Sequence, residues 1–383
     1  MSREVSIGAF IGLNNRLPVT RLETSLANRS PATYFRVADN VELTASGLIR
    51  RRQGFALASA GGFHSLWADE QDAYAVKDGA LLHIHPLTMA QTLAAPDVGA
   101  GRVSYARLPD GMVYWTNGRS IGRLSGAVAR DAVTPAPNPT PIATATAGSL
   151  TPGRYQVCFT ALSNDGESAT TEPQEVLLPN GGGIAFAGLT PATLVYATGA
   201  DGAVFNEIAP GDYLSPGNTG AVCSTFMLAT MPAGSAIAHY RGSLLVARGK
   251  FLYLSEPYRY GLMNAGRGFI PFPKEITVIQ PCEDGLYVCA DKTYWIPGDP
   301  LSANPVVVQP FGALPGSAVF DPEEQTAYWQ SRQGVVVAKP GGQTAAPQYA
   351  ALTFASASSG ATLVREQDGE RHVIAARFDV API

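Results

Sequence analysis

Ala73-Tyr74-Ala75-Val76-Lys77-Asp78-Gly79-Ala80-Leu81-Leu82 is an apolar strand that carries an aromatic residue, then a tight turn, then a second apolar strand. The turns that fit twisted paired strands need positive φ at their central residues, and Asp-Gly meets this need. The same pattern recurs at residues 112–118, 244–253, 286–295 and 327–337. A hairpin repeated about every 40 residues has the spacing of propeller blades, so the sequence predicts a β-propeller.

The composition favours an all-β chain. Of the 383 residues, 46% are hydrophobic and only 15% are charged, and there are 40 glycines and 29 prolines. Long exposed helices need charged residues on their outer faces, whereas closely spaced turns need glycine and proline. The balance therefore predicts short strands, and the length predicts two domains.

Charge, cysteine content and apolar runs exclude several classes of protein. No apolar run reaches the roughly 18 residues of a membrane span, and none near the start resembles a signal peptide, so we expect synthesis in a cytoplasm and no membrane span. The four cysteines form no C-x-x-C pair, which favours reduced thiols over a disulfide framework or a zinc site. A net charge of −4 gives no reason to expect a generic nucleic-acid binder.

Three stretches of the chain are expected to build the propeller. Residues 1–60 form an N-terminal segment that joins it, with an alternating strand at Tyr34–Leu43 and a short basic strand at Gly47–Phe55. Residues 61–133 contain the first blades, beginning with an inner strand at Phe63–Trp67, and residues 234–383 contain the others. The hairpins give about six blades if the N-terminal segment pairs with the last strands, near 361–365 and 372–376, and closes the ring.

Residues 134–233 interrupt this pattern. Proline occupies every second position of residues 134–141, which forces an extended linker. An alternating strand follows at Gly153–Ala161, then a turn at 164–168 and strands at 174–178, 183–186 and 193–197. Short strands separated by turns predict a β-sandwich of the fibronectin or immunoglobulin type, inserted between two blades at a loop tip.

The histidines give little sign of a metal or catalytic site. His83 and His85 would point to the same face of one strand, but no third ligand lies near them in sequence, so a half-exposed strand face explains the pair better than a metal does. His64, His239 and His372 are isolated, and core or surface positions explain them.

The remaining candidates for chemistry also have simpler explanations. Glu323-Glu324 follows Asp321-Pro322 in a predicted hairpin turn and fits solvated loop charge. Cys282 and Cys289 flank a predicted turn and fit buried apolar thiols, and a bridge between Cys158 and Cys223 is not expected in a cytoplasmically made protein. No nucleophile elbow, P-loop or dinucleotide fingerprint is present. We therefore expect no enzyme activity, no metal and no cofactor.

Arg50-Arg51-Arg52 is the one basic run. On a strand, Arg50 and Arg52 would share one face and Arg51 would take the other. These three arginines are candidate contacts to a neighbouring subunit or to DNA in a channel. Ion pairs with a neighbouring subunit, or a solvated strand edge that discourages unwanted pairing, are the favoured interpretations.

Several short motifs resemble those of tailed-phage virion proteins. They are Gly12-Leu13-Asn14-Asn15, Asn40-Val41, the basic strand that ends in Arg52-Gln53-Gly54-Phe55, and His239-Tyr240-Arg241-Gly242 followed by Leu254-Ser255-Glu256-Pro257. The inserted module, with Gly153-Arg154-Tyr155 and Asp165-Gly166-Glu167, shares the resemblance. In architecture the chain resembles the tail nozzle family of short-tailed phages, also called tail tubular protein B or tail hub.

This resemblance implies a non-enzymatic ring component of a phage tail. It implies a homohexameric nozzle below the portal and adaptor proteins, in contact with tail fibres or spikes, through which DNA is retained and then ejected without sequence-specific binding. The protein would be made in the bacterial cytoplasm and reside in the virion. Family members are usually longer, and this chain has room for one small insertion only.

Three alternatives differ in what they require of the sequence. A tail or baseplate component of a long-tailed phage belongs to the same structural class. A secreted glycan-binding or glycan-cleaving propeller requires a signal peptide and carboxylates on the blade loops, which the sequence does not show. An intracellular WD-type adaptor requires repeated Gly-His and Trp-Asp signatures, which are missing.

Overall fold

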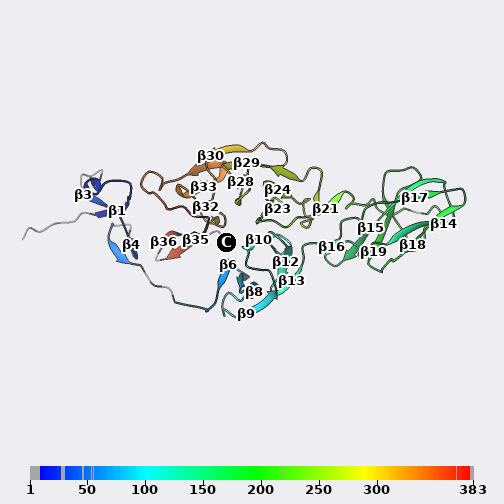
Figure 1. Cartoon of the computed structure of the whole chain (residues 1–383), viewed down its shortest axis with the longest axis horizontal. Coiled ribbons are helices and arrows are strands. Elements are labelled where there is room, and N and C mark those ends of the chain that lie inside the picture. The colour runs from blue at the N-terminus through cyan, green and yellow to red at the C-terminus, as the bar shows by residue number, and fades with distance from the viewer. Residues whose placement is uncertain are drawn as a thin grey trace, which may run out of the picture. The chain divides into compact units, whose positions relative to one another are not determined.

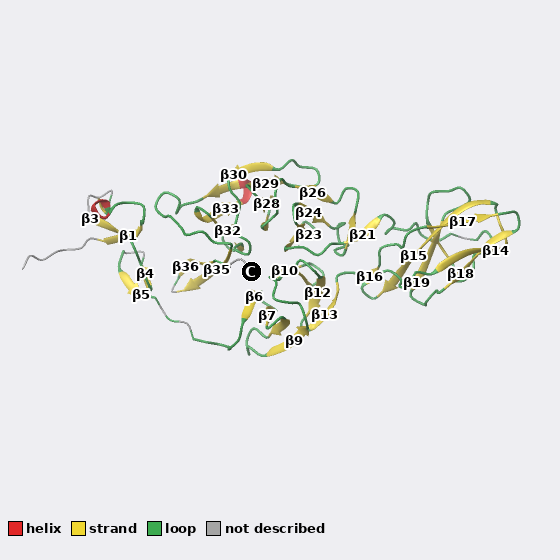
Figure 2. Cartoon of the chain, in the orientation of Figure 1, coloured by secondary structure: helices red, strands yellow, loops and turns green. Residues whose placement is uncertain are grey.

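The computed structural model describes residues 9–26, 31–44, 47–52, 54, 56–217, 219–367 and 369–379. Half of the chain is strand and 2% is helix, so the protein is all-β (Figure 2). The helices of the described residues are two short 3₁₀ turns, η1 at Val19–Arg21 and η2 at Pro340–Gly342. No helix in this part of the chain is long and apolar enough to cross a membrane. The chain forms two compact units, one of residues 62–272 and one of residues 1–61 with 273–383.

The unit of residues 62–272 contains three four-stranded antiparallel sheets (Figure 1). The first has β6 (Phe63–Ala68), β7 (Ala73–Lys77), β8 (Ala80–Ile84) and β9 (Gln91–Ala95). The second has β10 (Ser104–Arg107), β11 (Val113–Thr116), β12 (Ile121–Ser125) and β13 (Val128–Asp131). The third has β22 (Ala236–Tyr240), β23 (Ser243–Arg248), β24 (Phe251–Leu254) and β26 (Phe269–Pro271), and a separate pair joins β21 (Leu228–Thr230) to β25 (Leu262–Asn264).

All five predicted hairpins are confirmed as antiparallel strand pairs. At the β7–β8 turn, Asp78 has φ 51° and Gly79 has φ 79°, the positive values that a primed turn needs. The predicted inner strand at Phe63–Trp67 is confirmed as β6. Four-stranded antiparallel sheets therefore recur along the chain, in both units.

Aromatic residues of the repeated hairpins lie between neighbouring sheets. Tyr74 on β7 is fully buried, stacks near Tyr105 of the next sheet, and donates a hydrogen bond from its hydroxyl to the carbonyl of Gly126 at 2.9 Å. The Ser65 hydroxyl accepts a hydrogen bond from the Val103 amide at 2.9 Å, and Ser104 accepts one from Ile237 at 3.2 Å. Each sheet is therefore joined to the next by buried rings and by hydroxyl groups.

The same unit contains a second β module between β13 and β21. A two-stranded sheet joins β14 (Ile142–Leu150) to β18 (Gly182–Ala187). A five-stranded sheet contains β15 (Gly153–Ser163), β16 (Gly166–Glu167), β17 (Gln174–Leu178), β19 (Thr193–Ala197) and β20 (Asn206–Ile208). Residues of both sheets share one core, in which Phe159 and Ile184 are fully buried. The predicted strands of this module are confirmed.

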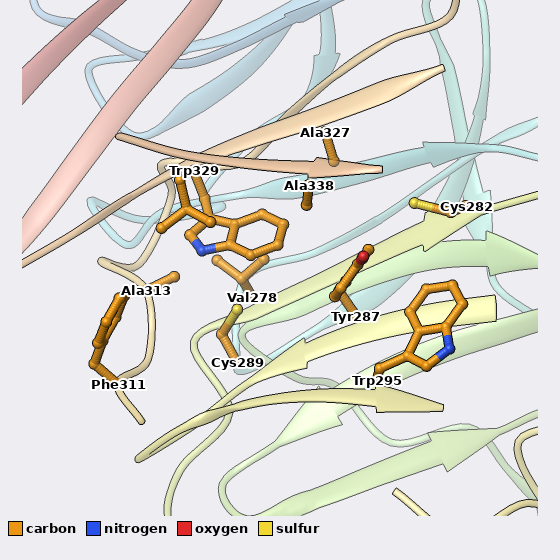
Figure 3. Packing of buried hydrophobic residues seen from close by; sticks show 11 residues of the cluster. Val278, Cys282, Tyr287, Cys289, Trp295, Phe311, Ala313, Ala327, Trp329 and Ala338 are labelled. Carbon is orange, nitrogen blue, oxygen red and sulfur yellow. The ribbon is translucent and has the colours of Figure 1, made fainter. Parts of the chain in front are cut away.

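The unit of residues 1–61 and 273–383 contains two more four-stranded sheets. One has β27 (Val278–Cys282), β28 (Gly285–Cys289), β29 (Thr293–Pro297) and β30 (Val306–Gln309). The other has β31 (Val319–Asp321), β32 (Thr326–Ser331), β33 (Gly334–Lys339) and β34 (Gln343–Ala345). Figure 3 shows Tyr287 of the first sheet and Trp329 of the second in the shared core, where their ring centroids are 5.3 Å apart.

The same unit contains an N-terminal module, which we define as the described residues between 9 and 52. Its sheet has the order β1 (Ala9–Leu13), β3 (Pro31–Phe35), β2 (Glu23–Ser25), and a separate hairpin joins β4 (Val41–Leu43) to β5 (Ile49–Arg51). The prediction of a single strand at Tyr34–Leu43 is therefore wrong. One strand ends at Phe35 and the next begins at Val41, and Asn40 between them takes a left-handed φ of 56°. The predicted basic strand is confirmed only at Ile49–Arg51, and its residues Gln53 and Phe55 lie outside the described residues.

The last strands, β35 (Ser359–Gln367) and β36 (Glu370–Phe378), form a hairpin at the predicted place. Gln330 of β32 is fully buried and its amide nitrogen donates to the carbonyls of Ala361 and Ala376, at 2.8 and 2.9 Å. The predicted backbone pairing of the N-terminal segment with the last strands is not found in the described residues, where β4–β5 and β35–β36 are separate two-stranded sheets. The strands of β4–β5 have three residues each, and side chains alone connect this hairpin to β35.

Candidate functional site

The basic strand lies on a two-faced hairpin. In the β4–β5 register, Glu42 lies opposite Arg50 and Val41 lies opposite Arg51. The Arg50 Nε donates to Glu42 Oε2 at 3.1 Å, and the Arg52 Nε donates to Asn40 Oδ1 at 3.4 Å. Arg50 and Arg52 thus share the polar face, as predicted from strand alternation, while Arg51 belongs to the other face and is exposed.

A cleft of about 380 Å³ opens between this polar face and the C-terminal hairpin. It is lined by Glu42, Arg52, Arg365, Arg371, His372, Val373 and Ile374. Arg365 on β35 lies with its Nη2 3.7 Å from Glu42 Oε1, and its buried Nε makes no hydrogen bond within the described part of the chain. Glu42 therefore pairs with both Arg50 and Arg365, and the cleft is lined by charged side chains of both signs.

Arg371 contributes less to this cleft than its position suggests. It forms ion pairs with Asp321 at 3.0 Å and with Glu323 in the β31–β32 turn. Glu324 and Glu366 lie 3.5 and 3.7 Å away. The hydrogen bond to Glu323 and the charges of Asp321 and Glu323 raise the pKa of Arg371, against the lowering effect of burial. This arginine therefore fixes the C-terminal hairpin to the β31–β34 sheet.

Arg365 and Glu42 were not identified from the sequence. Glu42 could have been found, because a short turn after Leu43 places it in cross-strand register with Arg50. Arg365 gave no such signal, since nothing local connects the last hairpin to the N-terminal module.

The histidines predicted to be non-catalytic have structural contacts. His83 Nε2 lies 2.8 Å from Asp72 Oδ1, whereas His85 Nδ1 accepts hydrogen bonds from the amides of Leu87 and Thr88 at 3.3 Å. The two rings therefore serve different neighbours. No group of three or more metal-ligating side chains occurs among the residues that the structure describes.

The His83 contact belongs to a charged network between the first two sheets. Arg107 of β10 donates from Nε to Asp69 at 2.7 Å and from Nη2 to Asp72 at 2.6 Å. Burial raises the pKa of Asp69, but hydrogen bonds from Arg107 and from the amides of Asp72 and Gln71 outweigh it, so the pKa is lowered from its ordinary value. This network joins the first two sheets, because Arg107 of β10 binds carboxylates of the β6–β7 turn.

Asp69→Asn is expected to lower the free energy of unfolding by about 1–2 kcal/mol at pH 7, because the ion pair is partly exposed. A carboxyl whose pKa is lowered in the folded state stabilises it above the unfolded pKa, about 3.9, and loses this effect as pH falls further. The wild type should therefore lose more stability than Asp69→Asn below about pH 4. Urea unfolding at pH 7, 4 and 3 measures this, with Asp131→Asn, at an exposed carboxylate, as control. A variant with the acid sensitivity of the wild type would contradict the network's role.

The cysteines are buried and free. Cys282 and Cys289 lie opposite Gly285 and Val278, at the two ends of the β27–β28 hairpin, and burial raises the pKa of each to about 12. This confirms the prediction of buried apolar thiols. The Cys158 thiol hydrogen-bonds to that of Cys223, which with burial raises the pKa of Cys158.

The Gly12–Asn15 motif forms a clamp with the C-terminal part of the same unit. The Asn15 side chain donates to the carbonyl of Thr353 at 2.8 Å and accepts from the Thr353 amide at 2.7 Å. Arg16 donates to the carbonyl of Leu352 at 3.0 Å and lies over the ring of Tyr349. Asn14 is buried, and its Oδ1 accepts from the amides of Arg16 and Leu17, which fixes the turn that presents both side chains.

Comparison with known proteins assigns no family to this chain. No known protein family and no curated protein matches it. Among solved structures, the computationally designed Ika8 protein is similar, with 12% identity and a TM-score of 0.28 over 82% of this chain and 96% of that one.

Two natural proteins show likenesses of the same size. The extracellular domain of a putative one-component system from B. thetaiotaomicron has 12% identity and a TM-score of 0.26 over 92% of this chain, which spans 57% of that protein. A virginiamycin B lyase from Staphylococcus aureus has 15% identity and a TM-score of 0.24 over 74% of this chain and 97% of that one. TM-scores of this size assign no function to the chain, and none of these proteins is a phage tail protein.

Proposed function

We propose that this chain is a non-enzymatic structural component of a bacteriophage tail, forming a ring below the portal and adaptor. In this proposal the repeated four-stranded sheets are blades of a β-propeller, and residues 134–233 are a fibronectin-like sandwich inserted between two of them. The propeller builds the wall of a passage in which DNA is retained and then ejected. The sandwich faces tail fibres or a neighbouring ring.

The observation that carries the proposal is what the N-terminal resemblance motifs do in the fold. The residues around Gly12–Asn15 clamp the N-terminal module to residues 349–353, and those around Asn40 and Arg50–Arg52 form the polar face of the β4–β5 hairpin. The first set attaches the N-terminal module to the C-terminal part of its unit, and the second set joins the two strands of the hairpin. Motifs that hold chain segments in place suit a rigid subunit of a ring.

The charge distribution agrees with a passage for DNA. A conduit must not hold DNA tightly, and a chain with net charge −4 has little affinity for phosphates overall. Of the three arginines in the basic run, Arg50 is bound to Glu42, whereas Arg51 is exposed. In this proposal the exposed Arg51, on the face opposite the cleft, contacts a neighbouring subunit or passing DNA, and Arg52 lines the cleft.

The test is reconstitution of phage particles that lack this protein. The purified chain is mixed with such particles, and its mass and position are followed by light scattering and electron microscopy. We expect a six-fold ring at the portal end and restored infectivity.

Other outcomes would overturn the proposal. A stable monomer that ignores the particles but binds a glycan array would favour the glycan-binding propeller. Binding at a baseplate would move the protein to another position in a tail.

A further inference from the structure

The N-terminal module has almost no core of its own. Among its described residues only Asn14 and Ala32 are buried. Its exposed apolar side chains include Val37, which is 77% exposed, Leu48, which is 67% exposed, and Ile49, which is 45% exposed. A segment of this size is stable only when its apolar side chains are covered, and clusters of uncovered ones mark interaction sites.

The β4–β5 hairpin turns its polar face toward its own chain. Glu42 and Arg50 lie on the side of Arg365 and the cleft. Strand alternation puts Val41, Leu43, Ile49 and Arg51 on the opposite face, and Val41, Ile49 and Arg51 are exposed there. A two-stranded hairpin with an open apolar face is marginal in water, so this face requires a cover.

The distribution of charge along the sequence indicates which surface covers this face. Residues 1–60 contain eight arginines, no lysine and four carboxylates, a net charge of +4. The remaining residues therefore contain 19 cationic and 27 acidic side chains, a net charge of −8. A basic segment joined to an acidic body is complementary to the body of another copy, and a head-to-tail contact of this kind can repeat around a closed ring.

The acidic body presents its charge at equivalent turns of two sheets. The β27–β28 turn exposes Glu283 and Asp284, and the β31–β32 turn exposes Glu323 and Glu324. Both turns join the first and second strands of sheets that share one core, so they lie at the same end of these sheets. Arg371 offsets part of the charge of the second turn only.

We propose that the open face of the β4–β5 hairpin, formed by Val41, Leu43, Ile49 and Arg51, docks on a second copy of this chain. Arg51 then faces that copy's acidic turns at 283–284 and 323–324. This inference names the self-contact of the proposed ring and rests on that proposed function for its role in the tail. The apolar side chains supply the buried area, and Arg51 supplies orientation and salt dependence.

Sedimentation equilibrium of the full chain up to 100 μM, at about 50 mM and about 500 mM salt, tests the contact. We expect self-association that weakens with salt. Ile49→Asp and Arg51→Glu should each weaken it by about tenfold or more, and Glu283→Arg in the Arg51→Glu chain should restore it. Leu87→Asp, at a site 89% exposed outside the module, is the matched control and should leave association unchanged. Circular dichroism confirms that each variant is folded.

A wild type that stays monomeric at both salt concentrations would overturn the inference, as would association that neither substitution weakens. Adding the same proteins to particles that lack the chain separates this result from the proposed function. If the hairpin is not the contact, Ile49→Asp will form the same ring on particles as the wild type. If the tail function is wrong, the wild type will associate in solution and Ile49→Asp will not, yet neither will bind particles.

Discussion

Gln330→Glu is expected to lower the free energy of unfolding by about 3 kcal/mol or more at pH 7. The Gln330 amide nitrogen lies 2.8 Å from the carbonyl of Ala361 and 2.9 Å from that of Ala376, and the residue is fully buried. The substitution keeps the shape but replaces the donor with a carboxylate oxygen that faces two carbonyl oxygens. Burial and repulsion then act together on the charged form.

The sign of the pH dependence follows from this geometry. Burial and the carbonyls raise the pKa of the introduced carboxyl in the folded state above its unfolded value, about 4.3. The protonated acid can donate a hydrogen bond, so the variant should approach the wild type as pH falls toward 4 and become less stable as pH rises through the folded pKa.

Urea unfolding of both proteins between pH 4 and 8 measures this effect. Gln325→Glu is the matched control, because Gln325 also donates to a backbone carbonyl, that of Pro322 at 2.7 Å, but is exposed. Its substitution should cost less than about 1 kcal/mol at any pH. A Gln330→Glu variant as stable as this control would show that other contacts hold the C-terminal hairpin.

Local sequence patterns predicted the hairpins, but they could not predict which side chains connect one element to another. Asp78-Gly79 specifies its turn through backbone conformation alone. The position of Tyr74 in the apolar strand before that turn predicts that the strand is buried. Gln330 looks in sequence like any polar strand residue. Its burial depends on the last hairpin packing against β32, which no local pattern encodes.

The candidate site also has a part that local patterns predict and a part that depends on tertiary packing. Strand alternation predicted that Arg50 and Arg52 share a face, since that rule needs only the period of a strand. It could not predict that Arg365 completes the cleft, because tertiary packing brings β35 to the hairpin. The break between Phe35 and Val41 was missed because apolar and polar residues alternate through it, whereas the left-handed Asn40 lies directly before the second strand.

Gly312→Ala is expected to lower the free energy of unfolding by about 3 kcal/mol. A Cβ at this position would lie 1.9 Å from the Ala290 carbonyl oxygen, so the backbone must move. The neighbours of Gly312 resist such movement. Thr293 donates to the carbonyl of Phe311 at 2.9 Å, and Thr277 donates to that of Ala313 at 2.8 Å. Thr293 begins β29, and Thr277 directly precedes β27. The chain between the two sheets is therefore fixed on either side of the glycine.

Thermal and urea unfolding of Gly312→Ala measure the cost, with Gly199→Ala as the matched control. At Gly199 an added Cβ meets nothing within 4 Å, and this substitution should change stability by no more than about 0.5 kcal/mol. Thr293→Ala tests whether the fixed loop is the cause. If it is, the double variant should be more stable than the sum of the two single losses predicts, because releasing Phe311 lets the backbone at Gly312 move away from Ala290. Strict additivity would show that the clash is not relieved through this hydrogen bond, and a Gly312→Ala variant as stable as Gly199→Ala would contradict the close approach itself.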